Sequence, residues 1–137
     1  MKESKYISQH SEKDIENHLI DNINEISNGC FWGDIKRHKS QYQLNGGVCS
    51  IICDVMIWHK DGSGTLIEVK KFKSINYLLS SIGQIILYGE LIHAHLGQYP
   101  RLVIACDHIP ELVKKIVKLN TPSIRLLELK GHRVEYI

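Results

Sequence analysis

The stretch SIICDVMIWHKDGSGTLIEVKKFK, residues 50–73, decides the fold of this chain. Two short apolar runs rich in β-branched residues flank a turn-forming segment, which predicts a β-hairpin with strands near 49–58 and 65–71. The turn should centre on Asp61–Gly62, because this dipeptide suits the positive φ that tight hairpins need. Residues equidistant from such a turn face each other in an antiparallel pair. We therefore expect Asp54 to lie opposite Glu68, to within one position.

The alternation of side chains gives this hairpin a polar centre. In a strand Glu68 and Lys70 share one face, while Val69 points to the other. The hairpin thus gathers two carboxylates and an ammonium at one place in an otherwise apolar sheet. Burying such ions costs several kcal/mol each unless something compensates them. A divalent cation would compensate them, so a metal site at Asp54 and Glu68 is the first hypothesis.

Length and composition predict a single globular domain spanning residues 1–137. The chain is 43% hydrophobic and 23% charged, which is ordinary for a soluble protein of 137 residues. No apolar run approaches the ~20 residues of a membrane span, and the polar N-terminal sequence does not resemble a signal peptide. We expect a cytoplasmic or nuclear protein that is neither secreted nor bound to a membrane. The four cysteines form no C-x-x-C pair and are expected to be buried free thiols.

Basic residues gather in short clusters although the net charge is only +2. One cluster covers residues 36–39 and another covers residues 70–73. Such clusters suit contacts with phosphate groups, although each taken singly fits a solvated face equally well. The residues that we assign to nucleic-acid binding are Lys36, Arg37, Lys39, Lys71 and Lys73.

Hydrophobic periodicity predicts the remaining elements. We expect an amphipathic helix over 11–26, a first strand within 31–44, a turn at Asn45-Gly46-Gly47, the central hairpin, a helix over 74–96, a strand over 101–106, a helix over 109–119, a strand over 124–129 and a small edge hairpin over 131–137. The order α-β-β-β-α-β-α-β predicts an α/β fold, a mixed sheet with helices on both sides.

These elements carry residues that resemble the PD-(D/E)xK nuclease superfamily. The resemblance covers residues 11–106: an acid on the first helix, Asp54 on a strand, Glu68-Val69-Lys70 across the hairpin, and a helix that carries Gln84. We place the first acid at Glu16, beside the apolar stripe, in preference to a glutamate one turn earlier. The layout is most similar to the catalytic domains of mismatch-cleaving and other repair endonucleases, whose last helix has a similar Gly-Gln-x-x-x-Tyr pattern. Cys53 stands at the position of the proline in the family's name, a departure common among its members.

The resemblance implies a restriction-endonuclease-like fold and a DNA endonuclease that depends on Mg²⁺ or Mn²⁺. Asp54 and Glu68 would bind the metal together with the backbone carbonyl of Val69, since Mg²⁺ prefers oxygen ligands and keeps several waters. Glu16 would bind it, or a second ion, through water. Lys70 would position or deprotonate the attacking water. Gln84 would donate to the scissile phosphate and accept from that water.

Two other functions remain open from the sequence. One is a nucleic-acid-binding module that keeps the fold without the chemistry, which the intact set of Asp54, Glu68 and Lys70 argues against. The other is an RNA nuclease, or an effector-gated nuclease, of the same fold. We also expect a homodimer, because symmetric dimers are the commonest oligomers and two sites would cut both strands.

Overall fold

A computed structural model describes residues 11–46, 49–130 and 133–137 of the chain. The helices and strands are, in chain order, α2 (Glu12–Asp21), α3 (Ile23–Gly29), β1 (Ile35–Gly46), β2 (Cys49–His59), β3 (Gly64–Lys70), α4 (Ile75–Leu96), β4 (Arg101–Cys106), α5 (Glu111–Asn120), β5 (Ile124–Lys130) and β6 (Arg133–Tyr136).

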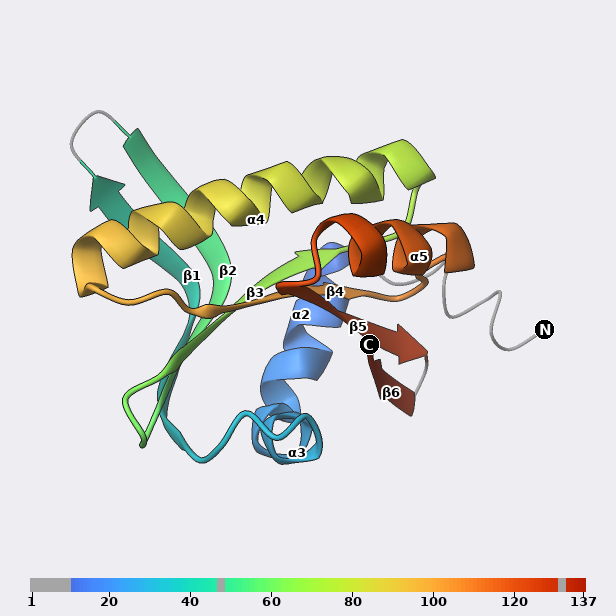
Figure 1. The fold of residues 1–137 in the computed structure, drawn as a ribbon. Coiled ribbons are helices and arrows are strands. Elements are labelled where there is room, and N and C mark those ends of the chain that lie inside the picture. The colour runs from blue at the N-terminus through green and yellow to red at the C-terminus, as the bar shows by residue number, and fades with distance from the viewer. Residues whose placement is uncertain (1–10, 47–48, 131–132) are drawn as a thin grey trace.

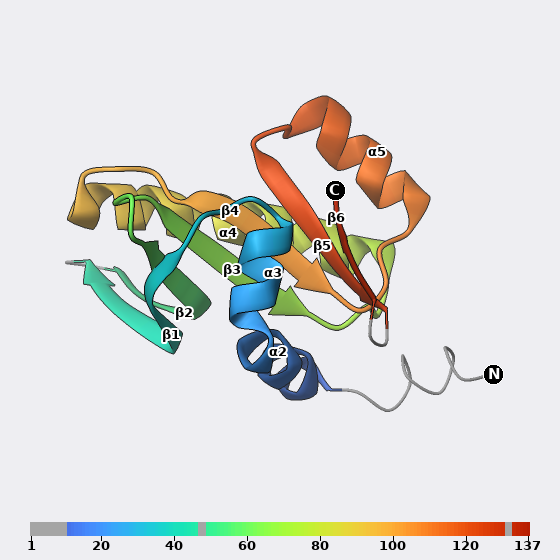
Figure 2. The same ribbon diagram turned by 90° about the horizontal axis from the view of Figure 1, so that it is seen from below.

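The strands form one mixed sheet in the spatial order β1-β2-β3-β4-β5-β6. β1, β2 and β3 are antiparallel neighbours, β3, β4 and β5 run parallel, and β6 returns antiparallel to β5. The parallel connections contain α4 and α5, which cover one face of the sheet, while α2 and α3 cover the other (Figure 1, Figure 2). The expected mixed sheet with helices on both sides is confirmed.

Each face of the sheet carries its own apolar core. Because side chains alternate along a strand, β3 gives Leu66 to the core under α4, and Ile67 and Val69 to the core under α2 and α3. Glu68 therefore lies on the α4 face, between two core residues of the opposite face. This alternation buries the Glu68 carboxylate on the face of the sheet that α4 covers.

The hairpin of β1 and β2 changes face halfway along its length. Cys53 belongs to the same core as Met56, whereas Val55 belongs to the opposite core. Strict alternation would instead put residues 53 and 55 on one face. The change of face therefore occurs at Asp54, and on the far side of it Leu44 and Ile51 join Cys53 in the core under α4.

The single helix expected over 11–26 is wrong, because α2 and α3 are separated at Asn22. This residue leaves helical geometry, with φ −117° and ψ 20°, and its amide donates to the carbonyl of His18 at 2.8 Å. Asparagine competes for backbone hydrogen bonds in this way and favours helix ends. The apolar stripe did not reveal the break because it continues across both helices, through Ile15, Leu19, Ile23 and Ile26.

Several other boundaries differ from those expected. β1 begins only at Ile35, because Phe31 and Gly33 take left-handed φ values of 60° and 98°, which strand residues rarely adopt. The expected turn at Asn45-Gly46-Gly47 is wrong in its first two residues, which pair with β2 as part of β1; Gly47 lies outside the described residues.

The C-terminal third follows the expectation more closely. α5 starts at Glu111 instead of residue 109, since Pro110 has extended backbone geometry and acts as the N-cap. β6 pairs with β5 and confirms the expected edge hairpin, whose residues 131–132 lie outside the described part.

α4 is apolar and 22 residues long. By length and composition it would suit a membrane span, the single such helix in the described part of the chain, so the expectation that no segment reaches that size is wrong. Counting uninterrupted apolar residues missed it because polar residues are interspersed. A core helix passes the same test, and Leu78, Ile85 and Ile92 of α4 are fully buried against the sheet.

Candidate functional site

The carboxylates of Asp54 and Glu68 meet where β2 and β3 separate. The antiparallel ladder between these strands ends at the pair Val55–Ile67, and Asp54 follows it opposite Glu68. The backbone N–H of Asp54 donates to Oε1 of Glu68 at 3.3 Å. The N–H of Val69 donates to Oδ2 of Asp54 at 2.7 Å. The expected facing of Asp54 and Glu68 is therefore confirmed, and a polar centre forms inside the sheet.

Burial and mutual repulsion raise the pKa of both carboxyl groups. Glu68 is 2% exposed, and burial followed by the charge of Asp54 raises its pKa to about 8. Burial also raises the pKa of Asp54; the hydrogen bond from Val69 opposes this, and the charge of Glu16 adds to it. The charge of Lys70 lowers both pKa values but has a smaller effect than burial. The surrounding side chains thus leave this carboxylate pair under-compensated.

Glu16 lies near the pair, on α2, with both of its carboxylate oxygens held. Oε1 accepts from Nε2 of Gln41 at 2.7 Å, and Oε2 accepts from Nζ of Lys13 at 2.8 Å. Glu16 itself is 3% exposed, and its charge contributes to the raised pKa of Asp54. With its oxygens engaged, Glu16 is better suited to hold a water beside Asp54 than to bind an ion directly.

Glu12, the glutamate one turn earlier, holds the segment that follows β3. Its Oε1 accepts from the hydroxyl of Tyr77 and from the backbone N–H of Lys71, the latter at 3.3 Å. The Tyr77 ring centroid lies 5.6 Å from Nζ of Lys70 and 4.7 Å from Nζ of Lys73. Glu12 and Tyr77 therefore order the lysine-rich segment, a role that the sequence analysis missed.

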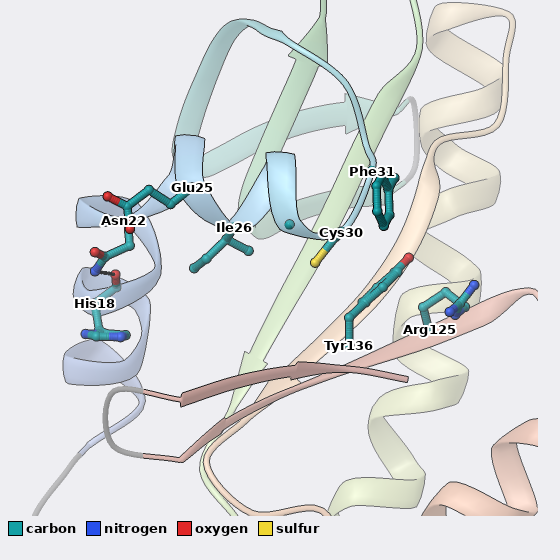
Figure 3. A pocket seen from close by; sticks show the side chains of 9 residues that line it. His18, Asn22, Glu25, Ile26, Cys30, Phe31, Arg125 and Tyr136 are labelled. Carbon is teal, nitrogen blue, oxygen red and sulfur yellow. Dashed lines mark hydrogen bonds between the residues drawn. The ribbon is translucent and has the colours of Figure 1, made fainter.

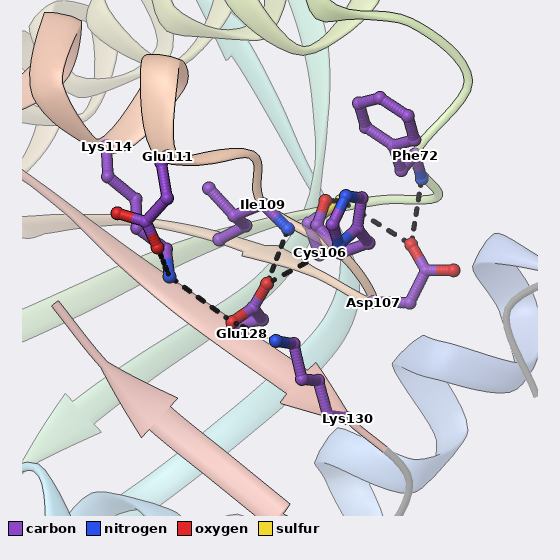
Figure 4. A network of polar contacts seen from close by, with 9 residues as sticks. Phe72, Cys106, Asp107, Ile109, Glu111, Lys114, Glu128 and Lys130 are labelled. Atoms are coloured by element: carbon purple, nitrogen blue, oxygen red, sulfur yellow. Dashed lines mark hydrogen bonds and ion pairs between the residues drawn. The ribbon is translucent and has the colours of Figure 1, made fainter. Parts of the chain in front are cut away.

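Lys70 ends β3 beside the carboxylates. Alternation puts it on the same face as Glu68, and its charge acts on both Glu68 and Asp54. The chain immediately after it is fixed by Asp107, whose Oδ1 accepts from the N–H of Phe72 at 2.8 Å (Figure 4). Asp107 is fully buried at the end of β4. The backbone at Lys70 is thus held by β3 on one side and by the bond from Phe72 to Asp107 on the other.

Glu128 on β5 provides a contrast with Glu68. It is equally buried, but its Oε2 accepts from the N–H of Ile109 at 2.6 Å, and the ammonium groups of Lys114 and Lys130 each lie 3.5 Å from Oε1 (Figure 4). Parallel strands bring their carboxyl ends to one edge of a sheet, which explains why these groups line up beside the site. Glu128 has two ammonium groups within ion-pair distance, whereas the charge of Lys70 only partly offsets the burial of Glu68.

Gln84 lies on α4 and is oriented by Tyr88. Its Nε2 donates to the Tyr88 hydroxyl at 2.8 Å. Burial raises the pKa of Tyr88, the bond from Gln84 opposes this, and the charges of Glu68 and Asp54 add to it. Tyr88 therefore lies within electrostatic range of the carboxylates. The spacing of four residues puts both side chains on one helix face, and it is the spacing of the Gly-Gln-x-x-x-Tyr pattern in the sequence.

The basic residues assigned to nucleic-acid binding fall into two groups. Lys71 and Lys73 follow Lys70 in the segment after β3, where the N–H of Lys71 donates to Glu12 and Nζ of Lys73 lies 4.7 Å from the Tyr77 ring centroid. Lys36, Arg37 and Lys39 are exposed on β1, the edge strand of the sheet. The guanidinium of Arg37 stacks 3.9 Å from the ring centroid of Trp58. The two groups thus lie on different elements, and the first follows directly after Lys70 in the chain.

A cavity of about 840 Å³ lies elsewhere, between the helix pair α2–α3 and the strands β5 and β6 (Figure 3). Its lining includes His18, Asn22, Phe31, Arg125 and Tyr136, and contains none of the proposed site residues. The carboxylate pair on β2 and β3 is thus separate from this cavity.

The carboxylate pair offers oxygen ligands that fit a divalent cation. Among the described residues, no three His, Cys, Asp or Glu side chains are grouped as a metal cluster. The N–H and C=O of one strand residue point to the same side, so Val69, whose N–H reaches Asp54, turns its carbonyl to that side too. Two carboxylates and a carbonyl are ligands that Mg²⁺ accepts while it retains several waters. The donors at Asp54, Glu68 and Val69 therefore suit such an ion.

Comparison with solved structures decides the fold, whereas no protein family and no curated protein matches the chain by sequence. A repair endonuclease from Pyrococcus abyssi superposes with a TM-score of 0.61 and 20% identity, over 89% of this chain and 48% of that one. Can2 from Sulfobacillus thermosulfidooxidans, in complex with cyclic tetra-adenylate, superposes with a TM-score of 0.60 and 16% identity, over 84% of this chain and 29% of that one. The expected restriction-endonuclease-like fold is confirmed.

The restriction-endonuclease-like fold explains the position of the polar centre. In this chain the central hairpin carries Asp54 and Glu68, whereas Gln84 lies on α4 and Glu16 lies on α2. The chain spans about half the length of the repair endonuclease and less than a third of Can2. The neighbours named here are proteins that carry this fold together with further segments.

Proposed function

We propose that this chain is an endonuclease that hydrolyses phosphodiester bonds in DNA with the help of Mg²⁺ or Mn²⁺. The observation that carries the proposal is the pair of facing buried carboxylates, Asp54 and Glu68, whose burial the charge of Lys70 only partly offsets, while Glu128 nearby has two lysines. An uncompensated buried pair lowers the stability of the fold. A bound divalent cation would compensate the buried charges, and the restriction-endonuclease-like fold supports this proposal.

The metal would be held by Asp54, Glu68 and the carbonyl of Val69, with Glu16 contributing through a water. When bound, a divalent cation lowers the pKa of a coordinated water and polarises the phosphate. Glu16 would orient that water, since Lys13 and Gln41 hold its carboxylate in place.

Lys70 and Gln84 would act on the substrate side of the same centre. Lys70 follows Glu68 on the same face, where its amine would position the attacking water and accept its proton. Gln84 uses one N–H for Tyr88, which leaves a second N–H for a phosphate oxygen and a carbonyl oxygen for the water. The Tyr88 hydroxyl becomes a further donor near the phosphate.

Lys71 and Lys73 would hold the phosphates next to the scissile bond, and Lys36, Arg37 and Lys39 would contact the backbone farther along the duplex. Such contacts supply affinity that does not depend on sequence. Two copies related by a two-fold axis would present two centres, one for each strand of DNA. A homodimer is therefore the proposed active form.

An RNA nuclease or an effector-gated nuclease of the same fold is the second candidate. The observation that favours it is the similarity to Can2, a structure that contains cyclic tetra-adenylate. Because this chain covers 29% of Can2, the effector would in that case act through a further segment or a partner. The choice of substrate and the response to effector distinguish the two candidates.

The decisive experiment compares plasmid DNA, single-stranded DNA and RNA as substrates, with Mg²⁺, with Mn²⁺ and with chelator, and with and without cyclic tetra-adenylate. We expect the wild type to cut DNA without effector and to be inactive with chelator. Asp54→Ala and Lys70→Ala should each lose at least ~100-fold in rate, the scale of a lost electrostatic or acid–base group.

Matched controls are Asp21→Ala and Lys118→Ala, which remove an exposed acid and an exposed lysine on helices. Both should cut at the wild-type rate. Equal activity of Asp54→Ala and wild type would refute the assigned site. Cleavage of RNA alone, or only after addition of the effector, would favour the second candidate.

A further inference from the structure

Gln41 has a backbone conformation that a strand residue rarely adopts. It lies within β1, yet its φ is +52°, in the left-handed region that residues other than glycine tend to avoid. Strand pairing continues on both sides of it in one register, with Ser40 opposite Val55 and Tyr42 opposite Cys53. No residue is inserted there, so the irregularity is a local twist of the chain and not a register shift. Such outliers persist where the surrounding structure over-determines them, and they cluster at functional sites.

The residue opposite Gln41 in this register is Asp54. The ladder skips this pair, and the N–H of Asp54 donates to Glu68 instead of to β1. This is also the point where β2 changes face between Val55 and Cys53. The left-handed turn of Gln41 lets β1 follow that change, so the bend that aims Asp54 at Glu68 involves both strands.

The side chain of Gln41 reaches the other acid of the centre. Its Nε2 donates to Oε1 of Glu16 at 2.7 Å, which joins β1 to α2 across 25 positions of sequence. The second partner of Glu16 is Lys13, whose side chain is 65% exposed. Gln41 is therefore the contact that ties Glu16 to the sheet, whereas Lys13 ties it only to its own helix.

We propose that Gln41 is a positioning residue of the carboxylate centre, which fixes Glu16 through its amide and supports the bend at Asp54 through its backbone. The inference rests on the proposed function, because it assigns Gln41 to the same metal-binding centre. Gln41 acts through Glu16 and Asp54 and touches neither the substrate nor the ion.

Two substitutions separate the amide from the backbone. Gln41→Ala removes the amide and keeps the left-handed strain, whereas Gln41→Gly removes the amide and suits a positive φ. Gln43→Ala is the matched control, an exposed glutamine two positions along β1 whose only described side-chain bond is a 3.5 Å contact with Asn45. Mn²⁺ affinity by calorimetry, the urea midpoint and the cleavage rate are measured for each variant.

We expect both Gln41 variants to bind Mn²⁺ about 10- to 100-fold more weakly, the range for residues that orient metal ligands, and to cleave more slowly by a similar factor. Gln41→Gly should keep or raise the urea midpoint of the wild type, which shows that the loss is not one of folding. Gln43→Ala should match the wild type in all three measurements.

Wild-type Mn²⁺ affinity in Gln41→Gly would overturn the inference and leave the proposed function intact. A lowered urea midpoint in Gln41→Gly with unchanged affinity in the folded protein would also overturn it, since it would assign Gln41 to stability alone. If the wild type bound Mn²⁺ but cut no nucleic acid, the nuclease proposal would fail, while the affinities would still test Gln41. A wild type that bound no Mn²⁺ would refute both.

Discussion

Replacing Glu68 by glutamine should stabilise the metal-free protein. Glu68→Gln keeps the size of the side chain and its acceptor for the N–H of Asp54, and removes one of two facing buried charges. The pKa of Glu68 is raised from 4.5 to about 8, so the native state binds more protons than the unfolded state between these values. The free energy of unfolding of the wild type therefore falls as pH rises through this window, and the loss is complete above the native pKa.

The size of the effect follows from that shift. Ionising a group whose pKa rises from 4.5 to about 8 on folding costs about 5 kcal/mol. Asp54 shares this cost and the pair can relax, so we expect about half of it, ~2 kcal/mol, to be recovered in Glu68→Gln at pH 8.5. For a chain of this length that corresponds to a rise of roughly 6–8 °C in Tm.

Urea denaturation from pH 5 to pH 8.5, without and with Mn²⁺, measures this prediction. The wild type should lose stability across the range and regain about 2.7 kcal/mol at a Mn²⁺ concentration of 100 Kd. Glu68→Gln should be flatter with pH and indifferent to Mn²⁺. Glu128→Gln is the control of opposite sign, because removing the charge that faces Lys114 and Lys130 should destabilise the protein. A Glu68→Gln protein less stable than the wild type at pH 8.5 would refute the reasoning.

Three further predictions concern the rest of the molecule. Asp107→Ala removes the acceptor of the Phe72 N–H and should cost about 1–3 kcal/mol in urea denaturation. Gly62→Ala should destabilise the protein by about 1 kcal/mol because its φ is +91°, whereas Gly83→Ala, on an open helix surface, should stabilise it by a similar amount in the same assay. In a Cys49→Ser background, thiol-reagent kinetics at pH 8 should be at least ~100-fold slower for the native than for the denatured protein. Burial protects the remaining thiols and raises their pKa to about 11 for Cys30 and about 12 for Cys53 and Cys106.

The regular parts of the fold could be predicted because each depends on a local pattern. The alternation and the Asp61–Gly62 turn predicted the central hairpin, and the structure confirms Asp54 opposite Glu68. Apolar runs predicted the strands before and after α4 and α5 along the chain. The break at Asn22 was missed because an apolar stripe records burial, and burial continues across a break that one side chain causes.

The surroundings of the site could be predicted only in part. Residues on the hairpin follow from counting away from a turn, and Tyr88 belongs with Gln84 to the Gly-Gln-x-x-x-Tyr pattern, which the bond between them explains. Gln41 gives no such signal, because glutamine is unremarkable in a strand and its left-handed φ arises from tertiary contacts. The bond between Glu12 and Tyr77 likewise joins segments 65 positions apart, beyond the reach of any periodicity.

The regular pairing of β2 with both of its neighbours is interrupted at Asp54, and the two interruptions are physically linked. A regular ladder would give the N–H groups of Asp54 and Val69 to neighbouring strands, and both would then be unable to hold carboxylates. The end of the β2–β3 ladder at Val55–Ile67 frees the N–H of Val69, and the skipped pair Gln41–Asp54 frees the N–H of Asp54; these two donors hold Asp54 and Glu68. The strand geometry places Lys70 on the same face as Glu68, two residues or about 7 Å further along β3. The interruption of regular pairing therefore creates the carboxylate pair, so a substitution that restored the ladder at Asp54 should abolish the proposed metal binding without changing a ligand side chain.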